Sequence, residues 1–278
     1  MGCLPALEEK VGVLGITTLS GGLDRVVDAP DRLERLPRLT RLGVQAALAA
    51  LAAAPRDDGR DTAIVVATSH GPVESTAEFA AGIRARGHAR GNPFLFPNVL
   101  YNAVAGEVAI RGGIRGHNVT VTNGELCGAA SLEIALLLLK TGRARRVVVL
   151  SVEDGGPLLG RVYGRLHRRG FGRTPPLSQL HPPAADVAVA LLLDPEVPGP
   201  LCIRRARTGQ AFTDEAFSDF VAQTGEGLEV SRVVRLERTA LPWLGRLLLA
   251  AAGLPRGTCT LVVHRGEGGG CGAVAFEN

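Results

Sequence analysis

Paired cysteines are absent from this chain of 278 residues. Its five cysteines are scattered and odd in number, and no two of them have Cys-x-x-Cys spacing; they occupy positions 3, 127, 202, 259 and 271. The pattern therefore indicates neither a disulfide framework nor a zinc site. We expect no metal and no cofactor, and we predict a reducing cytoplasm as the compartment.

Long apolar runs and aromatic residues are also scarce. No apolar stretch approaches the roughly 18 residues of a membrane-spanning helix. The amino terminus lacks the basic and apolar segments of a secretory signal. The chain carries a net charge of +4, but aromatic residues make up only 4% of it. Since no stacking aromatics accompany the basic residues, we predict no binding to nucleic acid. The lack of a long apolar run predicts no association with a membrane.

Hydrophobic residues, at 46% of the chain, supply ample material for a buried core. Strand-like and helix-like segments alternate, which is typical of an α/β protein with helices on its sheets. Strands are predicted at 11–16, 62–68, 118–122, 147–152, 185–194, 201–207, 258–264 and 272–277. Helices are predicted at 39–54, 73–86, 97–112, 126–141, 213–223 and 241–252. A long loop is predicted at 154–183, and loops of this length in a compact domain are usually functional or partly disordered.

The stretch from 118 to 153 organises the rest of the chain. A buried strand is followed by a sharp turn at Asn123 and Gly124, a strongly apolar helix that ends at Gly142, and a second strand. A strand, a tight turn with an exposed residue and a helix start together form a nucleophile elbow. Backbone N–H groups and the helix dipole then point at the side chain on the turn.

The sequence around this elbow resembles the acyl-binding core of the β-ketoacyl synthases, which have the thiolase fold. Three segments carry the resemblance, namely Asn92-Pro-Phe-Leu-Phe-Pro-Asn-Val-Leu-Tyr, Gly116-His-Asn-Val-Thr-Val-Thr and Gly142-Arg-Ala-Arg-Arg-Val-Val-Val-Leu-Ser-Val-Glu. The resemblance implies a thiolase-like layered α/β/α/β/α fold. Residues 1–194 would form its amino-terminal half and residues 195–278 a reduced carboxy-terminal half.

The resemblance places Glu125 where the synthases carry their nucleophilic cysteine. Aligning Gly128 and Gly142 with the family leaves Cys127 two residues later, where the synthases have a small residue. A glutamate suits the helix amino terminus electrostatically but is a poor thioester nucleophile. Partner subunits of the family, the chain-length factors, typically have glutamine here, and glutamate is nearly isosteric with it. Cys127 is interpreted as a core residue, with a nucleophilic role as the alternative.

Histidines support the same interpretation. Condensing synthases use two histidines besides the cysteine, one of them in a His-Gly-Thr-Gly-Thr motif that this chain lacks. The segment Val263-His-Arg-Gly-Glu-Gly-Gly-Gly-Cys-Gly resembles the turn after the other, so His264 is a site candidate or a structural strand-end histidine. His70 and His117 fall in predicted turns and receive no role.

Several residues are implied to lie at a subunit interface. In thiolase-fold dimers the strand before the elbow pairs with the same strand of the partner. In this chain that strand contains Val119 and Val121. Phe94, Phe96 and Tyr101, three of the ten Phe and Tyr residues, border that interface by resemblance. There they either line an acyl tunnel or pack as ordinary interface residues.

Together these features predict a non-catalytic, chain-length-factor-like subunit that is not active alone. It would pair with a ketosynthase that has an intact Cys-His-His site, in type II polyketide or aryl-polyene-type biosynthesis. The basic segment 165–173 is most simply interpreted as a solvated loop, with an acidic acyl carrier protein as a natural partner for such a patch. The alternatives are a decarboxylase or thioester-processing enzyme that uses Glu125 or Cys127, and a degenerate scaffold that binds acyl carrier protein.

Overall fold

A computed structural model describes residues 11–20, 33–55, 57–168, 187–196, 201–235, 258–265 and 270–277. Its helices are α1 Arg38–Leu51, α2 Val73–Arg86, α3 Ala103–Gly112, α4 Cys127–Lys140, α5 Pro157–Arg168 and α6 Asp214–Gly225. Its strands are β1 Val11–Ser20, β2 Thr62–Ala67, β3 Asn118–Val121, β4 Arg146–Glu153, β5 Val187–Asp194, β6 Leu201–Gln210, β7 Val230–Arg235, β8 Cys259–Arg265 and β9 Gly270–Glu277. Four 3₁₀ turns complete the described part, namely η2 Leu33–Arg35, η3 His88–Arg90, η4 Phe96–Val99 and η5 Gly124–Leu126.

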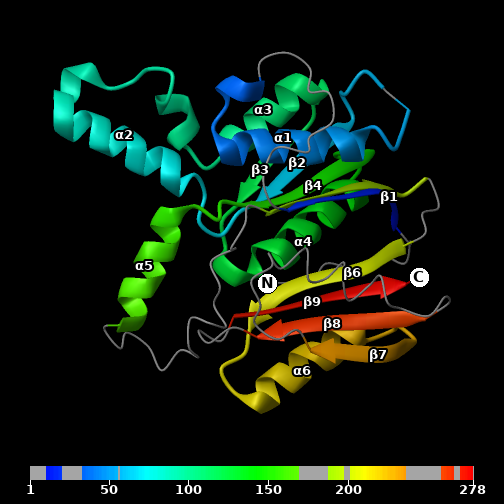
Figure 1. The fold of residues 1–278 in the computed structure, drawn as a ribbon. Coiled ribbons are helices and arrows are strands. Elements are labelled where there is room, and N and C mark those ends of the chain that lie inside the picture. Colours follow the sequence, from blue (N-terminus) through cyan, green and yellow to red (C-terminus); the bar gives the residue numbers. More distant parts are fainter. Residues whose placement is uncertain are drawn as a thin grey trace.

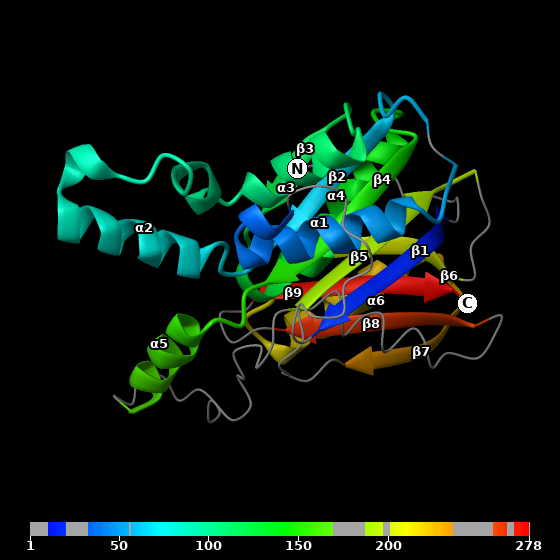
Figure 2. The same ribbon diagram turned by 45° about the horizontal axis from the view of Figure 1, so that its top comes forward.

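The strands form two stacked halves of one sheet. Their order is β3-β2-β4-β5-β1-β6-β9-β8-β7, and the halves are joined where residues 11–13 of β1 pair with residues 201–203 of β6. The sheet turns at this junction, so that α4 lies between the halves, α1 and α3 cover one outer face, and α6 covers the other (Figures 1 and 2). The expected thiolase-like layered α/β/α/β/α fold is confirmed. The division at residues 194 and 195 stays a prediction.

Helix α4 forms the core between the two halves. Leu132 and Leu136 pack with Val149 of β4 on one side and Phe276 of β9 on the other. Such a helix must be apolar around most of its circumference because sheets cover both of its sides. Each fully buried leucine of this kind contributes roughly 1.5–3 kcal/mol. The strongly apolar sequence of residues 126–141 therefore reflects the position of α4 in the middle layer of the fold.

Polar contacts also attach α4 to the second half of the sheet. The carboxylate of Glu133 accepts hydrogen bonds from the backbone N–H and the hydroxyl of Thr208 on β6, at 3.0 and 2.6 Å. Both interactions use the same oxygen, Oε2. This glutamate satisfies two donors at once and fixes the helix relative to β6.

Two helices project from the end of the sheet where β2 and β4 finish (Figures 1 and 2). Helix α2 buries only Ser75, and its first turn is attached to α5 because Glu74 Oε1 accepts the Leu158 N–H at 2.6 Å. We call residues 73–101, which comprise α2, η3 and η4, the arm. Among the described residues, no helix is both long and apolar enough to cross a membrane.

Some predicted elements differ from those observed. The predicted loop at 154–183 is wrong in its first part, which forms α5, while 169–186 lie outside the described residues. Strand β7 was not predicted, and the helix predicted at 97–112 is divided into η4 and α3. The helix predicted at 241–252 falls outside the described residues. The other predicted strands and helices are confirmed with shifts at their ends.

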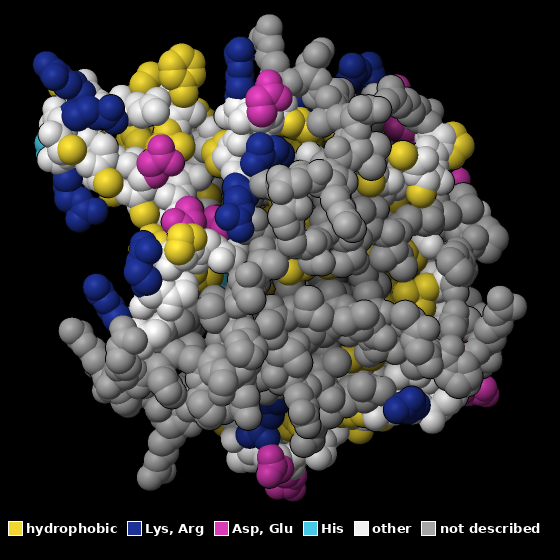
Figure 3. All heavy atoms as spheres, in the orientation of Figure 1, with side chains coloured by type: hydrophobic (Ala, Val, Ile, Leu, Met, Phe, Trp, Pro, Cys, Tyr) yellow, Lys and Arg dark blue, Asp and Glu magenta, His cyan; other side chains and the backbone are white. Residues whose placement is uncertain are grey.

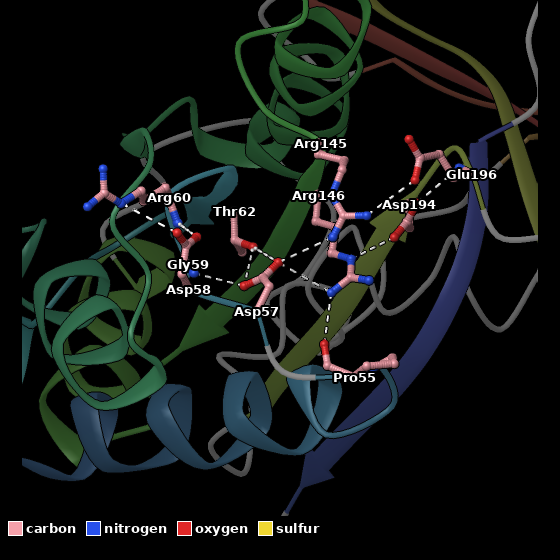
Figure 4. Close-up of polar contacts among 10 residues, drawn as sticks. All are labelled: Pro55, Asp57, Asp58, Gly59, Arg60, Thr62, Arg145, Arg146, Asp194 and Glu196. Carbon is pink, nitrogen blue, oxygen red and sulfur yellow. Dashed lines mark hydrogen bonds and ion pairs between the residues drawn. The ribbon is translucent and has the colours of Figure 1, made fainter.

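A network of charged residues joins the opposite end of the same strands (Figure 4). Arg146, at the start of β4, donates from Nε to Asp194 at 2.6 Å and from a terminal nitrogen to the Pro55 carbonyl at 2.9 Å. Asp57 contacts the same guanidinium at 3.4 Å and accepts from the Thr62 hydroxyl at 3.2 Å. The network thus ties the α1–β2 loop to the first residues of β2 and β4 and to the last residue of β5.

The electrostatics of Asp57 reflect this network. Partial burial opposes ionisation of the carboxyl, but hydrogen bonds from Gly59 and Thr62, together with Arg146 and Arg145, outweigh it. The pKa of Asp57 is therefore held below its usual value. Its stabilising contribution is present at neutral pH and is lost as the pH falls through that lowered pKa.

Replacing Asp194 with asparagine is expected to destabilise the chain by about 3–5 kcal/mol, because the buried Arg146 loses its closest counter-charge. Urea unfolding of the purified protein measures the change. The matched control is Asp58→Asn. Asp58 is the neighbour of Asp57 in the sequence, but its ion pair with Arg60 is exposed to solvent. Equal stability of the Asp194 and Asp58 variants would contradict the structural role given to the network.

Candidate functional site

The elbow, residues 122–127, has the predicted strand–turn–helix structure. Strand β3 ends at Val121, the Leu126 N–H donates to the Asn123 carbonyl at 2.9 Å, and α4 starts at Cys127. Gly124 has a positive φ of 49°, a conformation that favours glycine and makes the sharp turn possible. Glu125 lies in η5 at the centre of this turn, and its side chain lies outside what the structure describes.

Cys127 has the environment of a core thiol. Its side chain is only 2% exposed, and its sulfur lies 3.5 Å from the Ser69 hydroxyl. Burial raises the pKa of this thiol to about 12, and the negative charge of Glu153 adds to the effect. The α4 amino terminus favours a thiolate, but desolvation outweighs it here. At neutral pH Cys127 is therefore a protonated thiol, which is a poor nucleophile.

A buried carboxylate lies beside the elbow. Glu153, the last residue of β4, accepts hydrogen bonds from the Ser69 N–H and, at 3.5 Å, from the Thr68 hydroxyl. His70 Nδ1 lies 3.2 Å from the same carboxylate. The side chain of Glu153 is 5% exposed and that of His70 is 27% exposed. Three successive residues of the turn after β2 thus converge on one side chain from β4.

This turn, residues 68–71, also contacts the elbow directly. The Ser69 hydroxyl donates to the Gly124 carbonyl at 3.0 Å and approaches the Cys127 sulfur. Our expectation that His70 has no role was based on its turn position alone, and the structure instead pairs it with Glu153. A usable signal was present, since Glu153 is the one acidic residue in the sequence of the fully buried strand β4, RVVVLSVE.

His264 lies at the same end of the fold. It is 2% exposed and lies opposite Gly272 in the pairing of β8 with β9. Strand β9 in turn contacts η5 of the elbow. Neighbouring Val262 belongs to the core around α4 and Val263 to the core under α6. Because side chains alternate along a strand, His264 belongs to the face toward α4. The structure thus brings His264 to the elbow end of the middle layer.

The predicted interface residues separate into two groups. Val119 and Val121 are half-buried and pack against the core around α4. Phe94, Phe96 and Tyr101, which we call the gate residues, are 88%, 54% and 48% exposed. Phe96 packs on Phe79 with ring centroids 5.7 Å apart, and Tyr101 lies against Gly71 in the 68–71 turn. Of the three, Tyr101 is therefore the one connected to the 68–71 turn.

Comparisons with known proteins agree with this geometry. Residues 23–167 match the family model described as the beta-ketoacyl synthase N-terminal domain. Over 125 residues the chain is 29% identical to 3-oxoacyl-[acyl-carrier-protein] synthase 2 of Rhizobium meliloti (strain 1021), an alignment that covers 45% of this chain and 28% of that synthase. The chain thus aligns with under a third of the length of this relative.

Solved structures share the fold over nearly the whole chain. The ishigamide ketosynthase/chain length factor has a TM-score of 0.73 at 18% identity, with 96% of this chain and 99% of that chain covered. A type II PKS acyl-carrier protein in complex with its ketosynthase bound to the hexaketide has a TM-score of 0.75 at 13% identity, with 98% and 99% covered. At such identities the likeness shows the fold alone.

The buried thiol yields a chemical prediction. Iodoacetamide at neutral pH is expected to leave Cys127 unmodified in the folded chain, because only a small fraction of a thiol with a pKa of about 12 is ionised. Peptide mass spectrometry measures the labelling, and the half-buried Cys202 serves as internal comparison. Rapid labelling of Cys127, or an acyl adduct from an acyl thioester that Cys127→Ala abolishes, would show that it is a nucleophile.

Proposed function

This chain belongs to the β-ketoacyl synthase family, and from that premise we propose that it is a non-catalytic, chain-length-factor-like subunit. In this role it pairs with a ketosynthase that has an intact Cys-His-His site and shapes the tunnel for the growing acyl chain. The observation that carries the proposal is an elbow without a usable nucleophile. The setting is type II polyketide or aryl-polyene-type biosynthesis.

The elbow supports a non-catalytic role through two residues. The turn position holds Glu125, whose carboxylate would be a poor nucleophile toward a thioester. The nearest thiol, Cys127, is buried and protonated. A condensing reaction begins with transfer of an acyl group to a thiolate, and neither side chain supplies one. The buried His264 alone does not restore this step.

The sheet edge supports pairing with another subunit. Strand β3 is the terminal strand of the sheet and pairs only with β2 among the described strands. Its other edge presents backbone N–H and C=O groups to any partner strand, and such edges are normally covered. The sequence of β3 is Asn-Val-Thr-Val, rich in β-branched residues that favour strand pairing. A ketosynthase strand added here would continue the sheet into the partner.

The arm supports the same interface. Helix α2 contacts η3, η4 and α5 but has few contacts with the sheet layers, and the aromatic rings of Phe94 and Phe96 are largely exposed. Exposed apolar clusters of this kind usually mark a binding surface. Since the arm ends at Tyr101 and leads directly into α3, a partner on the β3 edge would also meet the gate residues. Their size would then limit the length of its acyl chain.

Charge on the arm supports acyl carrier protein as a second partner. Arg84, Arg86, His88 and Arg90 are all exposed within seven residues at the outer end of α2. In Figure 3 dark-blue side chains gather at this outer end. Arg165 on α5 is exposed as well, whereas 169–173 of the predicted basic segment lie outside the described residues. Arginine clusters attract acidic protein surfaces and accelerate their association.

Co-expression with a candidate ketosynthase tests the subunit role. We expect a heterodimer in native mass spectrometry, and we expect Tyr101→Ala and Phe96→Ala to assemble normally but to shift the products toward longer chains. Removing a large side chain from a tunnel wall opens space for further extension. The control is Phe212→Ala, because Phe212 is also exposed but lies before α6, far from β3 in the sheet order. Unchanged product lengths in both gate variants, or a chain that stays monomeric, would overturn the proposal.

Charge reversal tests the carrier-protein contact. Arg84→Glu combined with Arg86→Glu is expected to weaken binding of an acidic carrier protein to the complex at least several-fold, and the loss should shrink at high salt. Surface plasmon resonance measures the affinity. Arg143→Glu and each single arm variant are compared as matched charge reversals, since Arg143 is exposed just after α4, at the end of that helix that lies away from the elbow. Equal losses for Arg143→Glu and the single arm variants would indicate a general charge effect and no docking surface on the arm.

A further inference from the structure

The 68–71 turn is a junction between three segments that are distant in sequence. On one side it bonds to the elbow, through the Ser69 hydroxyl and the Gly124 carbonyl. On another side the ring of Tyr101 lies against Gly71. Below it, the Glu153 carboxylate holds the turn from β4. The turn therefore connects Tyr101 to the elbow through contacts at both of its ends.

A side chain at Gly71 would displace the Tyr101 ring, which lies directly against this glycine. A Cβ atom built on Gly71 would lie 2.5 Å from Cε1 and 2.7 Å from Cδ1 of the Tyr101 ring. Gly71 also has a positive φ of 66°, so glycine is favoured there by both conformation and space. The ring is thus positioned by direct contact with the backbone of the turn.

Glu153 is the residue that holds this turn in place. It binds the Ser69 N–H, the Thr68 hydroxyl and the His70 ring, and Thr68 in turn accepts the Gly71 N–H at 3.0 Å. A carboxylate that accepts from a backbone N–H and an imidazole is more strongly bound than a neutral acceptor. Because its side chain is almost fully buried, water does not replace these bonds when they are lost.

We propose that Glu153 is a positioning residue for product length, because it holds the 68–71 turn and thereby sets the Tyr101 ring beside the elbow. The inference rests on the proposed function, in which Tyr101 limits the acyl chain. Glu153 itself does not touch the acyl chain in this arrangement. Product length is then determined by a contact between β4 and the turn after β2 as well as by the size of the gate side chains.

Fluorine NMR on the isolated chain tests the positioning without any partner. The chain has two tyrosines, so 3-fluorotyrosine labelling gives two resonances, and Tyr101→Phe identifies that of Tyr101. Glu153→Gln keeps the shape of the side chain but replaces one carboxylate oxygen with an amide NH₂ group. This group cannot accept the hydrogen bonds that the turn donates, so the turn should relax. We expect the Tyr101 resonance to shift or broaden. An unchanged resonance overturns the positioning role, whatever the products are.

The matched control is Glu133→Gln. Glu133 also accepts a backbone N–H and a hydroxyl through one carboxylate, but it connects α4 to β6. We expect a comparable loss of stability with an unchanged Tyr101 resonance and unchanged products. If Glu133→Gln moves the resonance as much as Glu153→Gln does, the effect is general loosening and the proposal is wrong.

Product analysis in the complex tests the consequence. Glu153→Gln should shift product lengths in the same direction as Tyr101→Ala, and the double variant should shift them no further than Tyr101→Ala alone. Additive shifts, or a lower yield at unchanged lengths, would overturn the proposal. If Glu153→Gln moves the resonance but Tyr101→Ala leaves lengths unchanged, the gate of the proposed function fails and the positioning stands. Should Glu153→Gln fail to fold, Gly71→Ala displaces the ring directly and must move both readouts.

Discussion

Burial of α4 between two sheet halves is the constraint on which the other features of the molecule depend. The helix has to be apolar on nearly all sides, and its amino terminus has to emerge where β2 and β4 end. That position brings the elbow, the 68–71 turn and the last residue of β4 within hydrogen-bonding distance of one another. The same burial desolvates Cys127 and keeps its thiol protonated. The fold and the raised pKa of this buried thiol therefore share one physical cause.

Most of the fold could be predicted from the sequence because its strands are covered on both faces. Continuous apolar runs such as those of β2 and β5 have few other interpretations in an α/β protein. Strand β7 escaped prediction because it is an edge strand whose exposed Val233 and Arg232 give no clear alternation. Helix α5 was missed although its sequence, PLLGRVYGRLHR, has a proline at the first helical position and apolar residues at helical spacing. The signal was present, and the interpretation of 154–183 as one long loop overlooked it.

The site was predictable only in part, for a similar reason. The strand–turn–helix pattern located the elbow, and the resemblance placed Glu125 on it. The Glu153 cluster joins residues 83 to 85 positions apart in sequence, so no spacing rule could have assembled it. His70 illustrates the limit, since nothing in its turn position predicted its contact with a buried carboxylate. Polar residues at the carboxyl ends of buried strands are the signal to examine in related sequences.

The charged network of Figure 4 lies at the opposite end of β2 and β4 from the elbow. Arg146, Asp194 and Asp57 hold the amino ends of these strands together, and none of them contacts the elbow residues. Substitutions at the elbow can therefore accumulate without weakening the contacts that keep the layers assembled. Evolvability follows from this separation. A protein of this fold whose elbow residues change retains a foldable scaffold on which selection can act.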